Sequence, residues 1–364
     1  MIMSLYKEAV FPILQHFDAE RTHEITLKLL SLAEKYTFVK RFLEKIYSFE
    51  DPRLEVRALG LHFDNPLGLA AGFDKNAVAP RALGVLGFGH IEIGTVTPKF
   101  QAGNPRPRIF RLTEDSALIN RMGFPGRGVD AVKENLYRSR EREVILGINA
   151  GANKFSVEQG KAADDYVKVI SELASWADYL VVNISSPNTA RLRDLQGKEA
   201  LTQLLKEVRA GMRESGIVKP LIIKLAPDFE DMEKEVGTIL DVADRYKIDG
   251  IIATNTTVSR DGVTSSLRDE SGGLSGSPLK DRSTEVIKFS YRETQGKMPI
   301  IGIGGVFNAE DVVEKMEAGA SLVQVYTGLV YEGPGMVKGI KRDLVAFTER
   351  GGISNINVIV GAAV

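Results

Sequence analysis

The run YLVVNIS, at residues 179–185, is apolar on both faces for four residues and then turns polar. Runs of this kind are typical of parallel strands that helices cover on both sides. Similar runs recur along most of the chain, and helix-like stretches separate most of them. The other runs are LGLAA (67–71), IEIGTVT (91–97), VILGINA (144–150), LIIKLAP (221–227), GIIATNT (250–256), PIIGIGG (299–305) and LVQVYTG (322–328).

Strands that alternate with helices indicate right-handed parallel crossovers, and eight such units make a closed barrel. The sequence therefore predicts an α/β fold, a (β/α)8 TIM barrel with a small N-terminal helical extension. The alternative is an open doubly wound sheet, which the count of eight and the lack of a strand-linked GxGxxG disfavour. The predicted helices include 76–86, 162–175, 198–214, 230–246 and 309–318.

The N-terminal segment differs from the rest, because large apolar residues recur in it at helical spacing. Asp18 is the expected cap between the first two helices, and Pro12 is expected to kink or restart the first. We expect residues 1–47 to form a helical unit and residues 48–364 to form the barrel domain. Residues 52–65 alternate in polarity and contain turn residues, so they predict a hairpin.

Composition excludes several kinds of site. The net charge of −1 gives no reason to expect a nucleic-acid partner. Cysteine is absent, and the four histidines do not have metal-ligand spacing, so we expect no metal site and no thiolate chemistry. No apolar run approaches the length of a membrane span, and no secretory signal is visible. These observations predict a cytoplasmic protein without an integral membrane segment.

In a barrel, the carboxyl ends of the strands build the active site. Here these ends carry lysine, asparagine, serine and threonine, which would converge on one mouth. Lys224 lies in an otherwise apolar run, either in an internal salt bridge or as a cation over a cofactor that becomes negative, such as a reduced flavin. Lys75 either pairs with Asp74 or holds a substrate carboxylate.

Glycines follow the last two predicted strands, in GIGG (302–305) and YTG (326–328), and also occur in GGLSG (272–276). They are either ordinary turn glycines or a phosphate cradle of bare N–H groups. Phosphate sites of barrels form in the loops after strands seven and eight, which favours the cradle.

Ser186 opens the loop after the fourth predicted strand, with no histidine near it in the sequence. It either caps the turn before Pro187 or relays a proton in a site that excludes water. Asparagines gather at strand ends or in adjacent loops, and their amides suit a ring with alternating C=O and N–H groups. They are Asn120, Asn149, Asn183, Asn188 and Asn255.

Taken together and in order, these motifs resemble the dihydroorotate dehydrogenase family, in its membrane-associated, quinone-reducing class (class 2). The resemblance covers nearly the whole chain. The matching strings are GLAAGFDKN, IEIGTVTPK, GNPRPRIFRL, INRMGFPG, LGINAG, VVNISSPNT, IIKLAPD, IIATNTT, GGLSGSPL, PIIGIGGV and GASLVQVYTGLVYEGP.

The resemblance implies a flavoenzyme of de novo pyrimidine (UMP) synthesis that oxidises (S)-dihydroorotate to orotate with FMN. Ser186 matches the catalytic base, which takes the proton from C5 while a hydride leaves C6 for N5 of FMN. The implied substrate-binding residues are Lys75, Asn120, Arg121, Met122, Gly123, Phe124, Asn183, Asn188, Asn255 and Thr256. The implied FMN-binding residues are Ala71, Gly72, Phe73, Asp74, Lys75, Thr95, Asn149, Asn183, Lys224, Thr254, Gly276, Gly305, Tyr326 and Thr327.

The resemblance also gives the N-terminal helices a role, as an apolar tunnel through which a membrane quinone reaches FMN. His23 and Arg111 match positions near the quinone head. The expected location is peripheral, on the cytoplasmic side of the inner or cell membrane, with no protein redox partner. The alternative is that residues 1–47 only cover the edge of the barrel.

Two other functions remain open from the residues. One is a soluble enzyme of the same family that uses fumarate or NAD, although such relatives usually have cysteine where this chain has Ser186. The other is a barrel that binds FMN or a pyrimidine without turnover. The chain departs from the family at Pro125 and Phe73, and its apolar tail GGISNINVIVGAAV (351–364) has no role that the sequence indicates.

Overall fold

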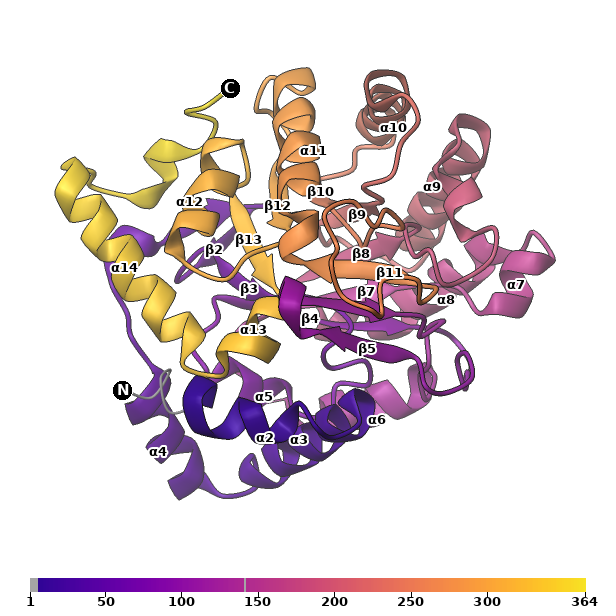
Figure 1. Ribbon diagram of the computed structural model, residues 1–364. Coiled ribbons are helices and arrows are strands. Elements are labelled where there is room, and N and C mark those ends of the chain that lie inside the picture. Colours follow the sequence, from indigo (N-terminus) through magenta and orange to yellow (C-terminus); the bar gives the residue numbers. More distant parts are fainter. Residues whose placement is uncertain (1–5, 141) are drawn as a thin grey trace.

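The eight predicted strands form one closed parallel barrel in the computed structural model, which describes residues 6–140 and 142–364 (Figure 1). The last strand closes on the first through pairs such as Val323 with Leu67. The predicted (β/α)8 barrel is therefore confirmed, and the open sheet is wrong. The strands are β3 (Leu67–Leu69), β4 (His90–Val96), β7 (Ile145–Ala150), β8 (Tyr179–Asn183), β9 (Leu221–Leu225), β10 (Gly250–Ala253), β12 (Ile300–Ile303) and β13 (Leu322–Val325).

Helices cover the outside of the barrel, each with an apolar stripe toward the strands (Figure 1). The stripe of α9, for example, buries Leu201, Leu205 and Val208. The predicted helix at 76–86 is shorter than expected, because Pro80 can start a helix but cannot lie inside one. The helices are α5 (Pro80–Gly84), α6 (Val129–Arg138), α7 (Lys154–Glu158), α8 (Ala162–Leu173), α9 (Lys198–Glu214), α10 (Met232–Arg245), α11 (Lys280–Glu293), α12 (Ala309–Glu317), α13 (Thr327–Glu332) and α14 (Met336–Gly351).

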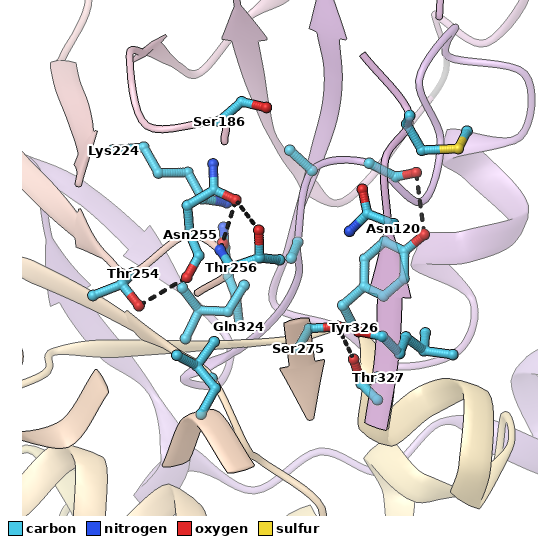
Figure 2. A pocket seen from close by; sticks show the side chains of 18 of the residues that line it. Asn120, Ser186, Lys224, Thr254, Asn255, Thr256, Ser275, Gln324, Tyr326 and Thr327 are labelled. Carbon is cyan, nitrogen blue, oxygen red and sulfur yellow. Dashed lines mark hydrogen bonds between the residues drawn. The ribbon is translucent and has the colours of Figure 1, made fainter. Parts of the chain in front are cut away.

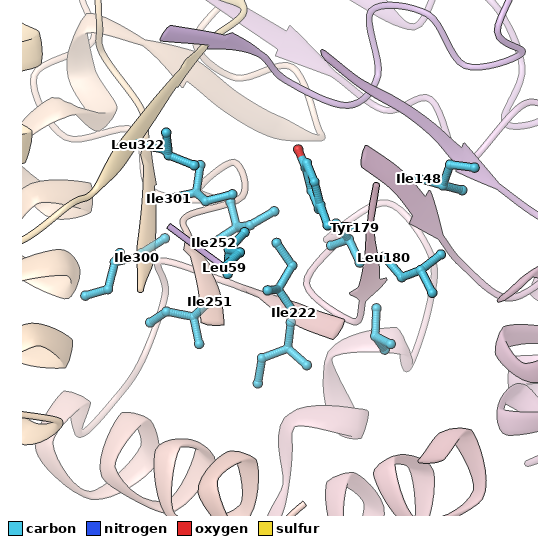
Figure 3. Packing of buried hydrophobic residues seen from close by; sticks show 14 of the residues in the cluster. Leu59, Ile148, Tyr179, Leu180, Ile222, Ile251, Ile252, Ile300, Ile301 and Leu322 are labelled. Carbon is cyan, nitrogen blue, oxygen red and sulfur yellow. The ribbon is translucent and has the colours of Figure 1, made fainter. Parts of the chain in front are cut away.

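Branched side chains such as Ile222, Ile252 and Ile301 fill the interior of the barrel around Leu59 (Figure 3). The predicted hairpin is present as β1 (Val56–Ala58) and β2 (Leu61–Phe63). Its turn residue Leu59 reaches the start of β10, where a Cβ added to Gly250 would lie 2.9 Å from the leucine Cδ2. The hairpin therefore plugs the end of the barrel opposite the mouth.

The apolar C-terminal tail packs against the same end. Ile356 and Ile359 are buried, and the Asn355 side-chain amide donates to the carbonyl of Glu55 at 3.1 Å. Burial of these two isoleucines explains why the tail is less polar than a solvent-facing terminus.

A three-stranded antiparallel sheet that the sequence did not predict lies at the mouth of the barrel. Its strands are β5 (Ile109–Leu112), β6 (Ala117–Asn120) and β11 (Gly273–Gly276), in the order β11-β6-β5. The sheet joins the loop after β4 to the loop after β10. It has its own small core, which includes Leu112, Ile119 and Leu274.

Short helices at the N-terminus pack beside this sheet. They are a π-helical turn (Tyr6–Val10), α2 (Phe11–Leu14), α3 (Ala19–Ala33) and α4 (Thr37–Tyr47). Asp18 caps α3 by accepting the backbone N–H of Arg21 at 2.8 Å, and Pro12 stands in the first turn of α2, as predicted. A buried ion pair of 2.7 Å between Arg108 and Glu20 holds α3 to the barrel.

Many apolar side chains of these helices are at least half exposed, namely Ile13, Phe17, Ile25, Leu29, Leu32, Tyr36, Phe38 and Phe42. We call this set the exposed apolar face. In the part of the chain that the structure describes, no helix combines the length and the apolar character needed to cross a membrane.

Candidate active site

A pocket opens at the carboxyl ends of the barrel strands, under the small antiparallel sheet (Figure 2). We call it the mouth pocket. Most of the residues predicted to bind substrate or FMN line it, although they come from distant parts of the sequence. They are Ala71, Gly72, Lys75, Thr95, Asn120, Met122, Gly123, Phe124, Asn183, Ser186, Asn188, Lys224, Thr254, Asn255, Thr256, Gly276, Gly305, Tyr326 and Thr327.

The two serines after β8 have different surroundings. Ser186 lines the mouth pocket, and its Oγ accepts the backbone N–H of Asn188 at 3.2 Å. Ser185 is fully buried, donates to Asn183 Oδ1 at 3.1 Å and accepts from Asn255 Nδ2 at 2.9 Å. Ser185 therefore has a positioning role, and Ser186 is the hydroxyl that faces the pocket.

Two asparagines on opposite sides of the mouth contact each other. Asn188 Nδ2 donates to Asn120 Oδ1 at 3.1 Å, so the loop after β8 meets the small sheet. On the far wall, Asn255 Oδ1 accepts the backbone N–H of Thr256 at 2.8 Å (Figure 2). Asn255 Nδ2 also donates to Ser185 Oγ at 2.9 Å, whereas the oxygen of the Asn188 amide has no hydrogen-bond partner among the described residues. Asn188 can therefore still accept from a ligand in the pocket that it lines.

The two lysines of the pocket are both shifted toward neutrality by burial. Lys75 donates to the carbonyl of Gly72 at 2.5 Å, and burial lowers its pKa to about 8. Burial also lowers the pKa of Lys224, and the charge of buried Glu92 opposes this shift. Within the described residues, the Lys224 ammonium group has no hydrogen-bond or ion-pair partner, so the predicted salt-bridge alternative is wrong there. An unpaired buried cation favours an anionic or polarisable ligand.

Glycines form the end of the pocket between β11, β12 and β13. Gly305 has φ +68°, and a Cβ there would lie 2.4 Å from Lys280 Cβ. Gly276 has φ +105°, and a Cβ there would lie 2.3 Å from the carbonyl oxygen of Ser116. Within the described chain, the N–H groups of Gly304 and Gly305 have no acceptor. This end can therefore cradle an anion with backbone N–H groups alone.

Four of the residues predicted to bind substrate or FMN do not line the mouth pocket. Arg121 points outward, pairs with Glu270 at 2.5 Å and lies over the ring of Phe110. Asp74 is buried and accepts the N–H groups of Val78 and Ala79, which shapes the loop after β3. Phe73 lines a second pocket, and Asn149 lies behind the wall, where its oxygen accepts from Thr95 and Asn183.

The sequence reading missed several pocket residues. Ile109 and Leu118 come from the small sheet, which had not been predicted, so nothing placed them at the mouth. Ser275 bonds to Thr327 at 2.8 Å between their hydroxyl oxygens and completes the glycine end. Gln324 gave a usable signal, since it is a lone amide in an apolar strand that also lines the pocket.

The second pocket lies between the N-terminal helices and the barrel, and apolar residues make up most of its lining. We call it the helix pocket. His23 bonds through Nε2 to the carbonyl of Phe73 at 2.7 Å, and burial lowers its pKa to about 4, so its ring is neutral at pH 7. Arg111 donates to the carbonyl of Phe17 at 2.7 Å. Both residues predicted to lie near a quinone therefore line this pocket.

The two pockets share part of their walls. Ile109, Leu118 and Tyr326 line both of them. The ring of Phe73 lies between the rings of Tyr326 and His23, with centroid distances of 5.7 Å and 4.7 Å. A group bound in the mouth pocket would thus be separated from the helix pocket by a thin layer of side chains.

Comparisons with known proteins agree on one family. The model for the family described as dihydroorotate dehydrogenase matches residues 53–347. The chain is 46% identical to a dihydroorotate dehydrogenase (quinone) from Christiangramia forsetii, over 94% of this chain and 99% of that protein. It is also 46% identical to the mitochondrial dihydroorotate dehydrogenase (quinone) of Mus musculus, over 98% and 90%. The crystal structure of DHODH from Eimeria tenella with ferulenol matches with a TM-score of 0.87 at 37% identity, covering 94% of this chain and 95% of that one.

Proposed function

The chain belongs to the dihydroorotate dehydrogenase family, and from this premise we propose how it works. It oxidises (S)-dihydroorotate to orotate in pyrimidine biosynthesis, with FMN as its flavin and a quinone as the electron acceptor. The observation that carries this proposal is the pair of adjoining pockets, one with many polar side chains in its lining and one with few, that share Ile109, Leu118 and Tyr326.

The mouth pocket fits FMN in two respects. The glycine end around Gly276 and Gly305 has free backbone N–H groups and no room for side chains, which suits a phosphate. The unpaired Lys224 lies deeper in the same pocket, where its positive charge would stabilise a reduced ring. When bound, FMN supplies a two-electron acceptor that takes a hydride from the substrate and is reoxidised by the quinone.

Ser186 is the proposed catalytic base. Its Oγ faces the pocket and accepts the N–H of Asn188, a contact that would hold the hydroxyl in place. As the oxygen takes the C5 proton, the hydroxyl would pass its own proton to a neighbouring acceptor. Lys75 would bind the substrate carboxylate, and the amides of Asn120, Asn188 and Asn255 would orient the ring. Neither Ser186 nor its hydrogen-bonded neighbour is a strong base, so the exclusion of water is part of the mechanism.

The helix pocket is the proposed quinone site. Its apolar lining suits an isoprenoid chain, while Arg111 and the neutral ring of His23 supply polar contacts for the head group. The exposed apolar face would lie in the membrane surface, at the pocket's outer side, so that quinone enters from lipid. The protein would then be peripheral, on the cytoplasmic side of the membrane, and need no protein redox partner.

Anaerobic mixing of the purified protein with dihydroorotate tests the first half-reaction. We expect the oxidised-flavin absorbance near ~450 nm to bleach, because hydride transfer reduces the ring. Addition of a short-chain ubiquinone or menaquinone should restore the colour. A protein that is bleached but recovers only with fumarate or NAD would contradict the quinone assignment, and a yellow protein that does not bleach would contradict the substrate.

A further inference from the structure

A glutamate and a glutamine inside the barrel have no part in the function proposed above. Glu92 on β4 and Gln324 on β13 are both fully buried. Gln324 Nε2 donates to Glu92 Oε2 at 2.9 Å. Within the described residues, no cationic group makes an ion pair with Glu92, so its burial is costly and needs a compensating role.

Among the residues that the structure describes, only donors face the Glu92 carboxylate. Asn149 Nδ2 donates to Oε1 at 2.7 Å, and the hydroxyl of Tyr179 donates to Oε2 at 3.4 Å, in addition to the contact with Gln324. A carboxylate can only accept hydrogen bonds. Both side-chain amides must therefore turn their NH2 groups toward Glu92 and their oxygens away from it.

The orientation of Asn149 is also fixed from its other side. Its Oδ1 accepts from Thr95 Oγ1 at 2.6 Å and from Asn183 Nδ2 at 3.0 Å. Asn183 Oδ1 in turn accepts from Ser185 Oγ at 3.1 Å. Glu92 thus fixes the orientation of the Asn149 amide, and hydrogen bonds link this amide through Asn183 to Ser185, the residue before Ser186.

The amide oxygen of Gln324 differs from that of Asn149, which accepts two hydrogen bonds. Its Oε1 is buried and has no hydrogen-bond partner within the described residues, although the side chain lines the mouth pocket (Figure 2). Lys224 and Thr254 line the same pocket. A buried free acceptor in a pocket wall calls for an N–H group on the ligand. The ring of oxidised flavin carries a single N–H group, at N3.

We propose that Glu92 is a positioning residue that turns the amide of Gln324, so that the Gln324 oxygen accepts the N3–H of the flavin ring. Glu92 itself touches neither substrate nor cofactor. This inference rests on the proposed FMN site and deepens it, because it names the group that recognises the ring edge.

The test compares two cofactors on the apoprotein. FMN and 3-deaza-FMN, in which a C–H replaces the N3–H, are titrated in their oxidised forms by isothermal calorimetry. We expect the wild type to bind FMN roughly ten- to a hundredfold more tightly, the effect of leaving one buried acceptor unpaired. A wild type that binds both with equal affinity would overturn the proposal.

The variant Glu92→Gln tests the role of the carboxylate. The substituted side chain would bring an NH2 group that must face an acceptor, so one neighbouring amide has to turn. Gln324 should be the one that turns, because two donors hold the Asn149 oxygen and none holds that of Gln324. We expect the preference for FMN over 3-deaza-FMN to disappear. An equal loss of affinity for both cofactors, with the preference retained, would indicate only a structural role and would overturn the proposal.

Two further variants keep the test decisive if Glu92→Gln does not fold. Gln324→Met removes the acceptor at similar volume and should abolish the preference. Tyr179→Phe removes the longest contact of Glu92 but leaves both amides oriented, so it should keep the preference. Retention of the preference in Gln324→Met would overturn the assignment of the acceptor.

The result is independent of catalysis, because no substrate is present. A wild type that prefers FMN but is not bleached by dihydroorotate would contradict the proposed reaction and leave the ring contact standing. An apoprotein that binds no FMN would contradict both.

Discussion

The mouth pocket and the helix pocket share a wall, yet different forces hold them in shape. In the mouth pocket, side chains from distant strands bond to one another, as in the chain from Glu92 through Asn149 to Asn183. In the helix pocket, the polar residues His23 and Arg111 each bond to a backbone carbonyl, and the rest of the lining is mostly apolar.

The difference follows from what each pocket is proposed to hold. Chemistry on a polar ring needs donors and acceptors fixed to within a fraction of an ångström. An apolar chain that enters from lipid needs a cavity of matching shape and low polarity, and short amphipathic helices can provide both. Variants should therefore separate the two half-reactions.

Substitution of the pocket-facing serine should impair only the reaction in the mouth pocket. We expect Ser186→Ala to slow flavin reduction by dihydroorotate about 10²- to 10⁴-fold, because general-base catalysis is lost. Stopped-flow absorbance gives this rate directly. Oxidation of chemically reduced flavin by a quinone should keep its wild-type rate. Normal bleaching in Ser186→Ala would exclude the serine as the base, and Ser171→Ala, at an exposed serine, serves as the matched control.

Substitution of residues in the exposed apolar face should weaken only the binding of the protein to membranes. Phe38 and Phe42 are 72% and 63% exposed. The double variant Phe38→Ser with Phe42→Ser should bind phospholipid vesicles about 10²- to 10⁴-fold more weakly, since each buried phenyl group contributes about 1.5–3 kcal/mol. Vesicle co-sedimentation measures this effect.

Bleaching by dihydroorotate should be unchanged in the same double variant. The matched control is Phe155→Ser, which removes a phenylalanine that is 66% exposed on α7. If the control weakens vesicle binding as much as the double variant, the membrane surface lies elsewhere.

The glycine end of the mouth pocket should not tolerate a side chain. Gly305→Ala adds a Cβ at φ +68° that would meet Lys280, so the cradle must shift. We expect about tenfold weaker binding of FMN, measured by flavin release on dilution. Gly216→Ala is the control, because Gly216 has a similar φ of +65° and nothing within 4 Å of the added Cβ. If both variants lose FMN affinity equally, backbone strain causes the loss and the side-chain clash in the cradle does not.

The two pockets should also differ in their response to pH. Burial lowers the pKa of Lys75 to about 8, so this lysine is charged below that pH and loses its charge as the pH rises through it. The kcat/KM for the dihydroorotate anion should fall by about tenfold between pH 7 and pH 9, since the cation that binds it is lost.

The kcat/KM for quinone should be flat over the same range, because His23, with a pKa of about 4, stays neutral. Lys75→Arg should move the fall to higher pH, since guanidinium remains charged. A profile for dihydroorotate that is equally flat would show that Lys75 does not bind the substrate as a cation.

Local signals in the sequence were sufficient to predict the barrel. Each strand is a short run with its own apolar pattern, and caps such as Asp18 depend on residues three positions away. The small sheet at the mouth was not predictable in this way. Asn120 pairs with Gly273, which lies 153 positions along the chain, and β11 reads as a glycine-rich loop.

The candidate site shows the same limit. Residue types and strand ends placed Ser186, Lys224 and the asparagines at the mouth, where the structure also has all of them except Asn149. The direction of each side chain could not be predicted from the sequence, because it depends on partners such as Glu270, which turns Arg121 outward. Gln324 was overlooked, although a lone amide in an apolar run is a signal in itself; what the sequence could not show is the carboxylate that orients this amide.

The pairing of β6 with β11 has a consequence for synthesis on the ribosome. Residues 117–120 leave the exit tunnel long before their partners at 273–276 are translated. Since domains fold from the N-terminus as the chain emerges, the early segment must wait with its strand edge unpaired. The mouth pocket is thus a late product of translation, and a chain released before residue 273 would expose an unpaired edge that chaperones must protect.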